Sequence, residues 1–286
     1  MNNRSLTQMR IAIYSRDCDA IEAPRLSNML ERLERESFNI YAVKGGDVII
    51  PGTDLVMSVG GDGTFLSASR RVGKSGIPIL GVNLGRLGFL SEYSPEEACD
   101  ALLSGDWYIE YRELLETRVA GASLESDPQF CPYSLNEVSV HRSGAALLGV
   151  DVAIDGHPLP TYWADGLLVA TSSGSTAYSL SVGGPICAPE AKVLIIAPIA
   201  PHNLNARPLV VPDSTRIAIS MRSRDDGVML SMDNRNHLVA PTVALDVMVA
   251  QFSLKRVRLK NTSFIKALTT KLFWGEDIRN SGEQQF

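Results

Sequence analysis

The sequence predicts a chain of the α/β plus β class, in which an α/β domain precedes a β-rich domain. In residues 1–98, short apolar runs alternate with segments of helical spacing, a pattern typical of a parallel sheet covered by helices. In residues 99–261, short strand-like runs are separated by polar and glycine turns. Residues 262–286 begin with helical spacing again, so we expect this segment to join the first domain.

The elements of the first domain are expected in alternating order. The run RIAIYS indicates a buried strand, and the helix after it places Leu26, Met29, Leu30 and Leu33 on one face. Ser94 and Pro95 are typical of a helix start. We expect strands within residues 10–15, 53–59 and 77–85, and helices at 24–36, 64–72 and 94–105.

The second domain is expected to be built from short strands. A buried strand, GLLVA, is indicated at residues 166–170. In the C-terminal segment, Phe264, Leu268 and Leu272 share one helix face. The other strands are expected within residues 107–121, 133–144, 147–159, 216–223, 227–235 and 252–260.

Composition and charge limit the classes of function. The chain has 286 residues, of which 45% are hydrophobic and 21% charged, as in ordinary globular proteins. Its net charge of −5 argues against a nucleic-acid partner, because no basic excess is present to neutralise phosphates. A small anionic ligand is compatible with this charge, since local dipoles and a few cations can hold it.

Cysteine, histidine and hydropathy patterns indicate a cytoplasmic protein. The cysteines lie far apart and match no zinc site or disulfide framework, which is typical of a reducing compartment. The histidines have no metal-ligand spacing and are expected on the surface or in loops. A polar leader and the lack of a long apolar run predict no membrane partner. The residues concerned are Cys18, Cys99, Cys131, Cys187, His141, His157, His202 and His237.

The stretch GGDGT, residues 60–64, follows a predicted strand and precedes a predicted helix. Such a turn lets a ligand approach backbone N–H groups that favour a phosphate, so Gly60, Gly61, Gly63 and Thr64 are candidate phosphate-binding residues. A bare carboxylate there would repel a phosphate. Asp62 is explained if it takes a proton from an attacking hydroxyl or organises a metal ion. The alternative is a tight turn in which Asp62 caps the helix.

A second glycine motif, ASRRVGKS at residues 68–75, nearly fits the spacing of a P-loop. A P-loop connects a strand to a helix, whereas Ala68 to Val72 continue the helix that follows GGDGT. We therefore expect Gly73 to end this helix and the P-loop interpretation to fail.

Two polar clusters stand out in the second domain. Asn136 and Glu137 are neighbours amid apolar strand residues, where they suit sugar hydroxyls and a purine edge, although an ordinary turn between strands is the simpler explanation. The run TSSGST, residues 171–176, precedes AYSLS, which could begin a helix. A helix start needs only one such hydroxyl, so the excess favours a polar ligand cradle.

Together these motifs resemble those of the NAD kinases. The resemblance rests on GGDGT, NLGRLGFLSE (83–92), NE (136–137) and DGLLVATSSGSTAYSLSVGGPI (165–186), and it covers most of the chain after about residue 50. GGDGT alone is also similar to turns of lipid kinases and phosphofructokinases, but the full series is specific. The resemblance implies a Rossmann-like N-terminal α/β domain and a β-rich C-terminal domain. It also implies transfer of the γ-phosphoryl group of ATP, or of polyphosphate in some members, to the 2′-hydroxyl of the adenosine ribose of NAD.

The resemblance further implies roles for single residues. Asp62 matches the catalytic aspartate, which takes the hydroxyl proton or organises Mg²⁺ or another divalent metal held mainly by the ATP phosphates. Asn136 and Glu137 match the pair that binds ribose and adenine, Phe89 would pack on the adenine, and Asp165 would lie on the nicotinamide side. The set implied to bind NAD is Asp62, Gly63, Phe89, Asn136, Glu137, Asp165, Ser173, Thr176, Ala177, Tyr178 and Ser181.

Two stretches depart from the family pattern. Residues 171–173 read Thr-Ser-Ser where Thr-Pro-Thr is common, which keeps the hydroxyls but loses a rigid turn. Residues 233–235 read Asp-Asn-Arg where Asp-Gly-Gln is common, so the role of Arg235, in binding a phosphate or a neighbouring subunit, stays open. The resemblance also implies a homodimer or homotetramer.

Two alternative functions differ from an NAD kinase in single features. A dinucleotide-binding sensor would have no need of Asp62 opposite a phosphate. A lipid kinase would require an apolar substrate channel in place of the polar run TSSGST.

Overall fold

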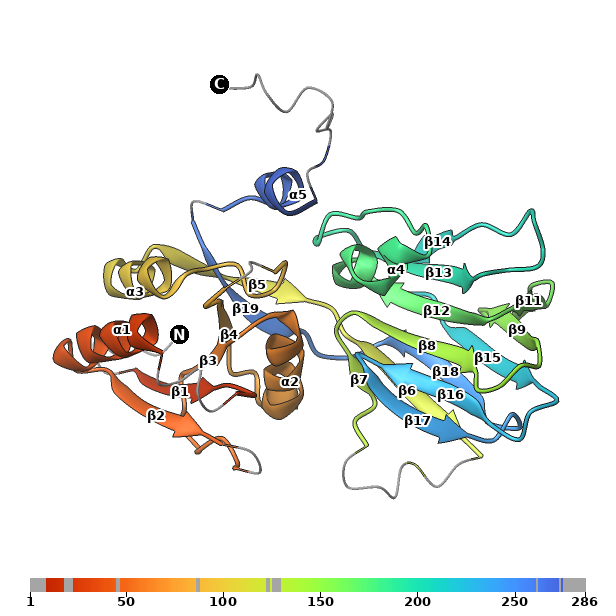
Figure 1. Ribbon diagram of the computed structural model, residues 1–286, viewed down its shortest axis with the longest axis horizontal. Helices are drawn as coiled ribbons and strands as arrows, with labels where there is room; N and C mark the ends of the chain where they lie inside the picture. Colours follow the sequence, from red (N-terminus) through yellow and green to blue (C-terminus); the bar gives the residue numbers. More distant parts are fainter. Residues whose placement is uncertain are drawn as a thin grey trace. The chain divides into compact units, whose positions relative to one another are not determined.

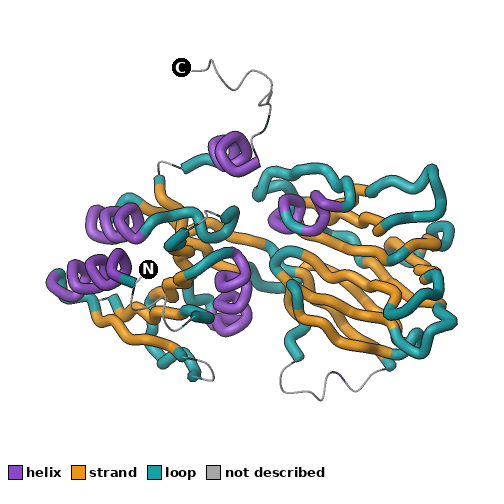
Figure 2. Tube along the Cα trace, in the orientation of Figure 1, coloured by secondary structure: helices purple, strands orange, loops and turns teal. Residues whose placement is uncertain are grey.

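The chain forms two compact units in the computed structural model (Figure 1). Unit 1 comprises residues 1–111 and 255–286, and unit 2 comprises residues 112–254. The structure describes residues 9–17, 23–44, 47–85, 88–121, 124, 130–260, 262–272 and 274. Figure 2 shows that the longer helices belong to unit 1, whereas unit 2 is almost entirely strand and loop.

Unit 1 contains a six-stranded sheet with the strand order β2-β1-β3-β4-β19-β5. The pairings from β2 through to β19 are parallel, as the alternating pattern predicts. The strands are β1 (Arg10–Tyr14), β2 (Asn39–Val43), β3 (Leu55–Val59), β4 (Ile79–Val82), β5 (Trp107–Arg112) and β19 (Leu254–Leu259), and the helices are α1 (Pro24–Arg35), α2 (Asp62–Val72), α3 (Pro95–Ser104) and α5 (Phe264–Leu272), with the short η3 (Gly73–Ser75) after α2.

Helices cover both faces of this sheet. Leu55 and Met57 of β3 belong to the core cluster that α1 and α3 complete, whereas α2 lies on the opposite face in Figure 1. Helix α3 begins where the sequence predicts, because Ser94 and Glu97 form a reciprocal capping box. Helix α2 ends at Val72, and Gly73 follows with a φ of 48°, so the P-loop interpretation fails as expected.

Unit 2 is a pair of antiparallel sheets around one apolar core. One sheet has the order β10-β9-β15-β18-β6-β7 with β11 paired to β9, and the other has the order β14-β13-β12-β8-β16-β17. The strands are β6 (Leu115–Ala120), β7 (Tyr133–Ser134), β8 (Glu137–Arg142), β9 (Leu148–Ile154), β10 (His157–Pro158), β11 (Tyr162–Ala164), β12 (Gly166–Thr171), β13 (Val193–Ile199), β14 (Leu209–Pro212), β15 (Ile217–Arg222), β16 (Val228–Met232), β17 (Arg235–Val239) and β18 (Ala244–Val249).

The two units divide at different residues from those we expected. The expected β-rich domain began at residue 99 and ended at 261, but α3 continues to Ser104, and β5 and β19 are strands of the unit 1 sheet. Strand β19 pairs with β4 through Arg256 and Ile79, which lie far apart in the sequence. A strand's own residues indicate that it is extended and not which sheet receives it, and this explains the difference.

The histidine prediction was wrong for two residues. His141 lies half-buried on β8, and His237 lies half-buried on β17. His141 belongs to the predicted strand run at residues 133–144, whereas His237 lies on β17, beyond the predicted run at 227–235. The partial burial of both follows from their places in the sheet.

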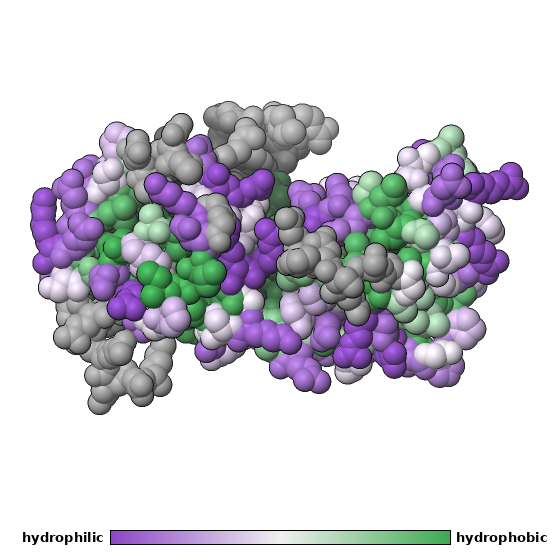
Figure 3. All heavy atoms as spheres, turned by 90° about the horizontal axis from the view of Figure 1, so that it is seen from below, coloured by the Kyte–Doolittle hydropathy of each residue, from purple (hydrophilic) through white to green (hydrophobic). Residues whose placement is uncertain are grey.

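No helix among the described residues is both long and apolar enough to cross a membrane. Figure 3 shows hydrophilic residues over much of the face it displays, with smaller apolar areas on each unit.

Candidate active site

The GGDGT turn joins β3 to α2 in unit 1, and its glycines differ in what the fold requires. Gly60 has a φ of 143°, and a Cβ there would lie 2.5 Å from Thr64 Oγ1. The fold therefore requires glycine at position 60. Thr64 is buried against this glycine, which gives it a packing role beside the predicted role in phosphate binding.

Gly61 and Gly63 have no such structural requirement among the described residues. Gly61 has an ordinary φ of −78°, and a Cβ would have no heavy atom within 4 Å. A Cβ on Gly63 would meet only Arg16 Nη1 at 3.4 Å. Gly63 lies in the first turn of α2, where glycine costs roughly 0.5–1 kcal/mol relative to alanine. These two glycines fit the close approach of a ligand to the backbone.

Asp62 is the first residue of α2, and it does not cap that helix. The N-cap is Gly61, which makes no side-chain cap hydrogen bond. The Asp62 carboxylate instead accepts backbone N–H groups from Phe89, Leu90 and Ser91, each at 2.9 Å. Oδ1 accepts two of these bonds and Oδ2 accepts one, so Oδ2 retains an acceptor direction. The helix-capping alternative is therefore wrong.

Gly88 completes this arrangement, although no role was predicted for this residue of NLGRLGFLSE. A Cβ at Gly88 would lie 2.0 Å from Asp62 Oδ1 and 2.7 Å from Oδ2. Side chains other than hydrogen are thus excluded by the carboxylate itself. The signal in the sequence was the second glycine of NLGRLGFL.

In unit 2, Asn136 and Glu137 form the turn that enters β8. The Asp233 carboxylate accepts the N–H groups of Leu135 at 2.6 Å, Asn136 at 2.9 Å and Glu137 at 3.2 Å. The pair therefore forms a turn between strands, whose backbone Asp233 fixes, and its role in binding a ligand stays a prediction.

Asp233 itself lies in a two-residue turn between β16 and β17. Asp233 and Asn234 have φ values of 47° and 63°, as a type I′ hairpin turn requires. Asparagine tolerates this conformation, so the turn is kept although the family commonly has glycine there. The Arg235 guanidinium donates to the carbonyl groups of Met232, Cys131 and Tyr133. Arg235 thus has a structural role within unit 2.

The Glu137 side chain is in an unusual electrostatic state. Its pKa is raised to about 8, first by burial and then by the negative charge of Asp233, while a hydrogen bond from the Tyr178 backbone opposes the increase. Oε2 is buried and has no hydrogen-bond partner among the described residues. At neutral pH the group is therefore mostly a protonated carboxyl that can donate or accept one further bond.

The hydroxyl run after β12 divides into two sets. Thr171, Ser172 and Ser175 donate to backbone carbonyl groups of Leu135, Pro189 and Cys187, so part of the excess of hydroxyls is structural. Gly174 lies against the other cluster, because a Cβ there would be 2.1 Å from the Asn136 carbonyl oxygen. The two polar clusters of unit 2 therefore form one connected surface.

The predicted NAD-binding residues of this run are the more accessible set. Ser173 and Thr176 lie half-buried in η5 (Ser173–Thr176), Ala177 and Tyr178 are half-buried at the start of α4 (Tyr178–Ser181), and Ser181 is exposed. Ser173 accepts a hydrogen bond from Arg112 at 3.1 Å. The Tyr178 ring stacks on His141 with centroids 5.7 Å apart.

Asp165 precedes β12 and is paired with a cation. Its carboxylate accepts a hydrogen bond from Arg142 Nε at 2.6 Å, and both side chains are about two-fifths exposed. The predicted nicotinamide-side role of Asp165 thus has to accommodate this ion pair.

Comparison with known proteins identifies the family. The family profile of the ATP-NAD kinase N-terminal domain matches residues 19–104, and that of the C-terminal domain matches residues 135–259. An NAD kinase of Bacteroides fragilis is 43% identical over 95% of this chain and 100% of its own length. One of Cytophaga hutchinsonii is 42% identical over 79% of this chain and 78% of its own length. The chain belongs to the NAD kinase family.

Solved structures of NAD kinases share the fold. A yeast NADH kinase complexed with NADH has a TM-score of 0.80 at 26% identity, covering 96% of this chain and 90% of that one. An NAD kinase from Archaeoglobus fulgidus in complex with ATP has a TM-score of 0.76 at 26% identity, covering 93% and 99%. The predicted family, fold class and enzyme class are confirmed: the chain is a phosphotransferase that converts NAD to NADP with ATP.

Membership in the NAD kinase family excludes both alternative functions. A lipid kinase is excluded by the curated relatives, and a pure dinucleotide sensor does not phosphorylate NAD. The roles of the single site residues are not decided by the comparisons and remain predictions.

Proposed function

We propose that this NAD kinase uses Asp62 as the general base that accepts the proton of the 2′-hydroxyl of the adenosine ribose. The observation that carries the proposal is the Asp62 carboxylate, which three backbone N–H groups orient while Oδ2 keeps one acceptor direction. As the hydroxyl oxygen forms its bond to the γ-phosphorus of ATP, the bond to the bridging oxygen breaks. The hydroxyl proton passes to Asp62, and ADP leaves with the bridging oxygen.

Gly61 and Gly63 support the phosphate-binding part of this proposal. Neither is required by backbone conformation or packing among the described residues, and Gly63 weakens the helix that contains it. Backbone N–H groups at the start of α2 are suited to an anion. The Archaeoglobus relative was solved with ATP, which is in keeping with this use of the turn.

A divalent cation, Mg²⁺ or another, fits the chemistry of Asp62. The free acceptor direction on Oδ2 can bind the hydroxyl or a water molecule of the cation. When bound with the nucleotide, such a cation neutralises phosphate charge. The phosphates would hold it in the main, with Asp62 as the protein's contribution.

We assign NAD binding in unit 2 to the surface that Asn136, Glu137 and the loop from Ser173 to Tyr178 share. The unpartnered Glu137 Oε2 supports this assignment, because a buried polar atom needs a partner and a nucleotide hydroxyl or ring nitrogen would supply one. The yeast relative was solved with NADH. Asp165 and Ser181 are the peripheral members of the set, since Asp165 is already paired with Arg142 and Ser181 is exposed.

We also propose a cytoplasmic location and a homodimer or homotetramer. The location is supported by the free thiols of Cys99, Cys131 and Cys187, whereas Cys18 lies outside the described residues. The assembly rests on the family resemblance alone. Size-exclusion chromatography with light scattering measures its mass directly.

The decisive assay measures NADP formation by the purified protein. NAD or NADH is incubated with Mg²⁺ and either ATP or polyphosphate, and the product is quantified with an NADP-specific dehydrogenase. We expect NADP from NAD and ATP, and a strongly reduced rate of its formation when Asp62→Asn replaces the wild type. Turnover by Asp62→Asn near the wild-type rate would refute the general-base role.

A further inference from the structure

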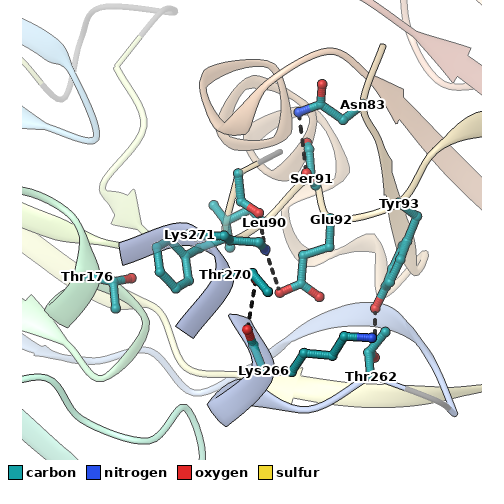
Figure 4. A network of polar contacts seen from close by, with 12 residues as sticks. Asn83, Leu90, Ser91, Glu92, Tyr93, Thr176, Thr262, Lys266, Thr270 and Lys271 are labelled. Atoms are coloured by element: carbon teal, nitrogen blue, oxygen red, sulfur yellow. Dashed lines mark hydrogen bonds and ion pairs between the residues drawn. The ribbon is translucent and has the colours of Figure 1, made fainter. Parts of the chain in front are cut away.

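Charged side chains hold the loop of residues 88–91 by both sides of its backbone. The Asp62 carboxylate binds its N–H groups, as described above. On the carbonyl side, Arg256 Nη2 donates to Phe89 O and Leu90 O, each at 3.0 Å. Lys271 Nζ donates to Gly88 O, and Figure 4 shows its side chain directed at Glu92 beside the same loop. The loop thus links an anion to two cations.

The two cations come from the C-terminal part of unit 1. Arg256 lies on β19 and Lys271 on α5. The matched family segments end at residue 259, so α5 lies outside both of them. Neither side chain lies in the sequence motifs on which the family resemblance rests.

The positive and negative side chains around Lys271 are equal in number only when Asp62 is included. Glu92 pairs with Arg256 at 3.2 Å, Lys271 at 3.3 Å and Arg258 at 3.6 Å, and Glu110 is the second acid of the cluster. Three cations therefore face two acids, and Asp62 across the loop is the third acid. Burial lowers the pKa of Lys271, and the charges of Glu92 and Asp62 oppose that decrease.

Lys271 also covers the ring of Phe89. Its Nζ lies 5.1 Å from the ring centroid, within the range of a cation–π contact. Phe89 donates its N–H to Asp62 and is predicted to pack on the adenine. Lys271 therefore contacts the loop through a carbonyl group, a neighbouring carboxylate and an aromatic face.

We propose that Lys271 is a positioning residue for Asp62, because it fixes the loop whose N–H groups orient the Asp62 carboxylate. The proposal rests on the general-base role proposed for Asp62. The reaction rate falls steeply when the base is misplaced, since a displacement of about 1 Å can lower the rate on the order of 10²-fold. Substrate affinity depends on other contacts and should change less.

Lys271 is a better probe than Arg256. The Arg256 side chain is 1% exposed and pairs with both Glu92 and Glu110, so its removal would take a cation out of a buried charge cluster and endanger the fold. Lys271 is 11% exposed and lies on a terminal helix. Lys271→Met keeps the apolar stem and removes the charge, and Lys271→Arg restores the charge. Lys266→Met is a matched control, because it removes a charge from an exposed position of the same helix.

The experiment measures kcat and the KM for NAD and for ATP for these variants, with circular dichroism to establish folding. We expect Lys271→Met to lower kcat by about ten-fold or more with KM values within about two-fold. Lys271→Arg should recover most of the rate, and Lys266→Met should resemble the wild type.

A double-mutant cycle separates this proposal from the role of Asp62. If Lys271 acts through Asp62, Lys271→Met should cost little further rate in the Asp62→Asn background. Equal losses in both backgrounds, or a kcat for Lys271→Met like that of Lys266→Met, would overturn the positioning role. Undiminished turnover by Asp62→Asn would refute the general base instead, so the two failures can be told apart.

Discussion

Gly88 lies so close to the Asp62 carboxylate that no side chain fits at position 88. A Cβ at position 88 would lie 2.0 Å from Asp62 Oδ1, and the next three residues donate their N–H groups to the same carboxylate. The loop and the carboxylate therefore have one joint conformation. A substitution in the loop should therefore displace the carboxylate, and a substitution of Asp62 should displace the loop.

Gly88→Ala should displace the Asp62 carboxylate and lower kcat by roughly 10²-fold, the order of loss expected for a misplaced catalytic group. Steady-state kinetics with NAD and ATP measure this. Gly85→Ala is the control, because a Cβ at Gly85 meets no described atom within 4 Å. Equal activity of the two variants would contradict the contact.

Gly63→Ala and Gly60→Ala should separate stability from function. Alanine at position 63 improves the first turn of α2, so the free energy of unfolding should rise by about 0.5–1 kcal/mol while kcat/KM for ATP falls. Alanine at position 60 meets Thr64 and an unfavourable φ, so stability should fall. Urea unfolding and kinetics on the same preparations test both. A fully active Gly63→Ala would remove the close-approach explanation.

Asp62→Asn should reduce turnover by about 10²–10⁴-fold, the usual contribution of general-base catalysis. The amide keeps the carbonyl oxygen for part of the N–H set but places an NH₂ group against the remainder, so the loop should loosen as well. NAD affinity measured by calorimetry should change little. A large loss of NAD affinity would place Asp62 in substrate binding instead.

Glu137 should make folding stability depend on pH. Its pKa of about 8 in the folded protein exceeds the ordinary glutamate value of 4.5, so the folded state binds the proton more tightly. The contribution of Glu137 to the free energy of unfolding is complete below about pH 4.5 and is lost as the pH rises through 8. The loss is at most about 1.4 kcal/mol per pH unit.

Glu137→Gln tests this electrostatic state. The amide resembles the protonated acid, so the variant should lose the pH-dependent decrease in the free energy of unfolding between pH 5 and 8. NAD affinity of the variant should lie near the wild-type value at pH 6 and differ most at pH 9. Chemical denaturation and calorimetry across this range provide the measurements, and parallel stability curves for the two proteins would contradict the raised pKa.

The sequence by itself determined the features that depend on neighbouring residues. Local spacing and backbone preference predict the strand, glycine turn and helix at residues 55–72. They also predict the capped start of α3 and the end of α2 at Gly73. The order of the motifs was sufficient for the family. Candidate residues such as Asp62 and Glu137 could be named because their types stand out in apolar surroundings.

Only the tertiary structure decided which distant residues meet. Strands β5 and β19 join the first sheet from distant parts of the chain. The loop at residues 88–91 likewise meets two distant residues, Asp62 through hydrogen bonds and Lys271 through a carbonyl group. The pKa of Glu137 likewise depends on Asp233, almost a hundred positions away. Local pattern records the preference of each segment for helix, strand or turn, whereas pairing, burial and charge proximity arise only when the chain has folded.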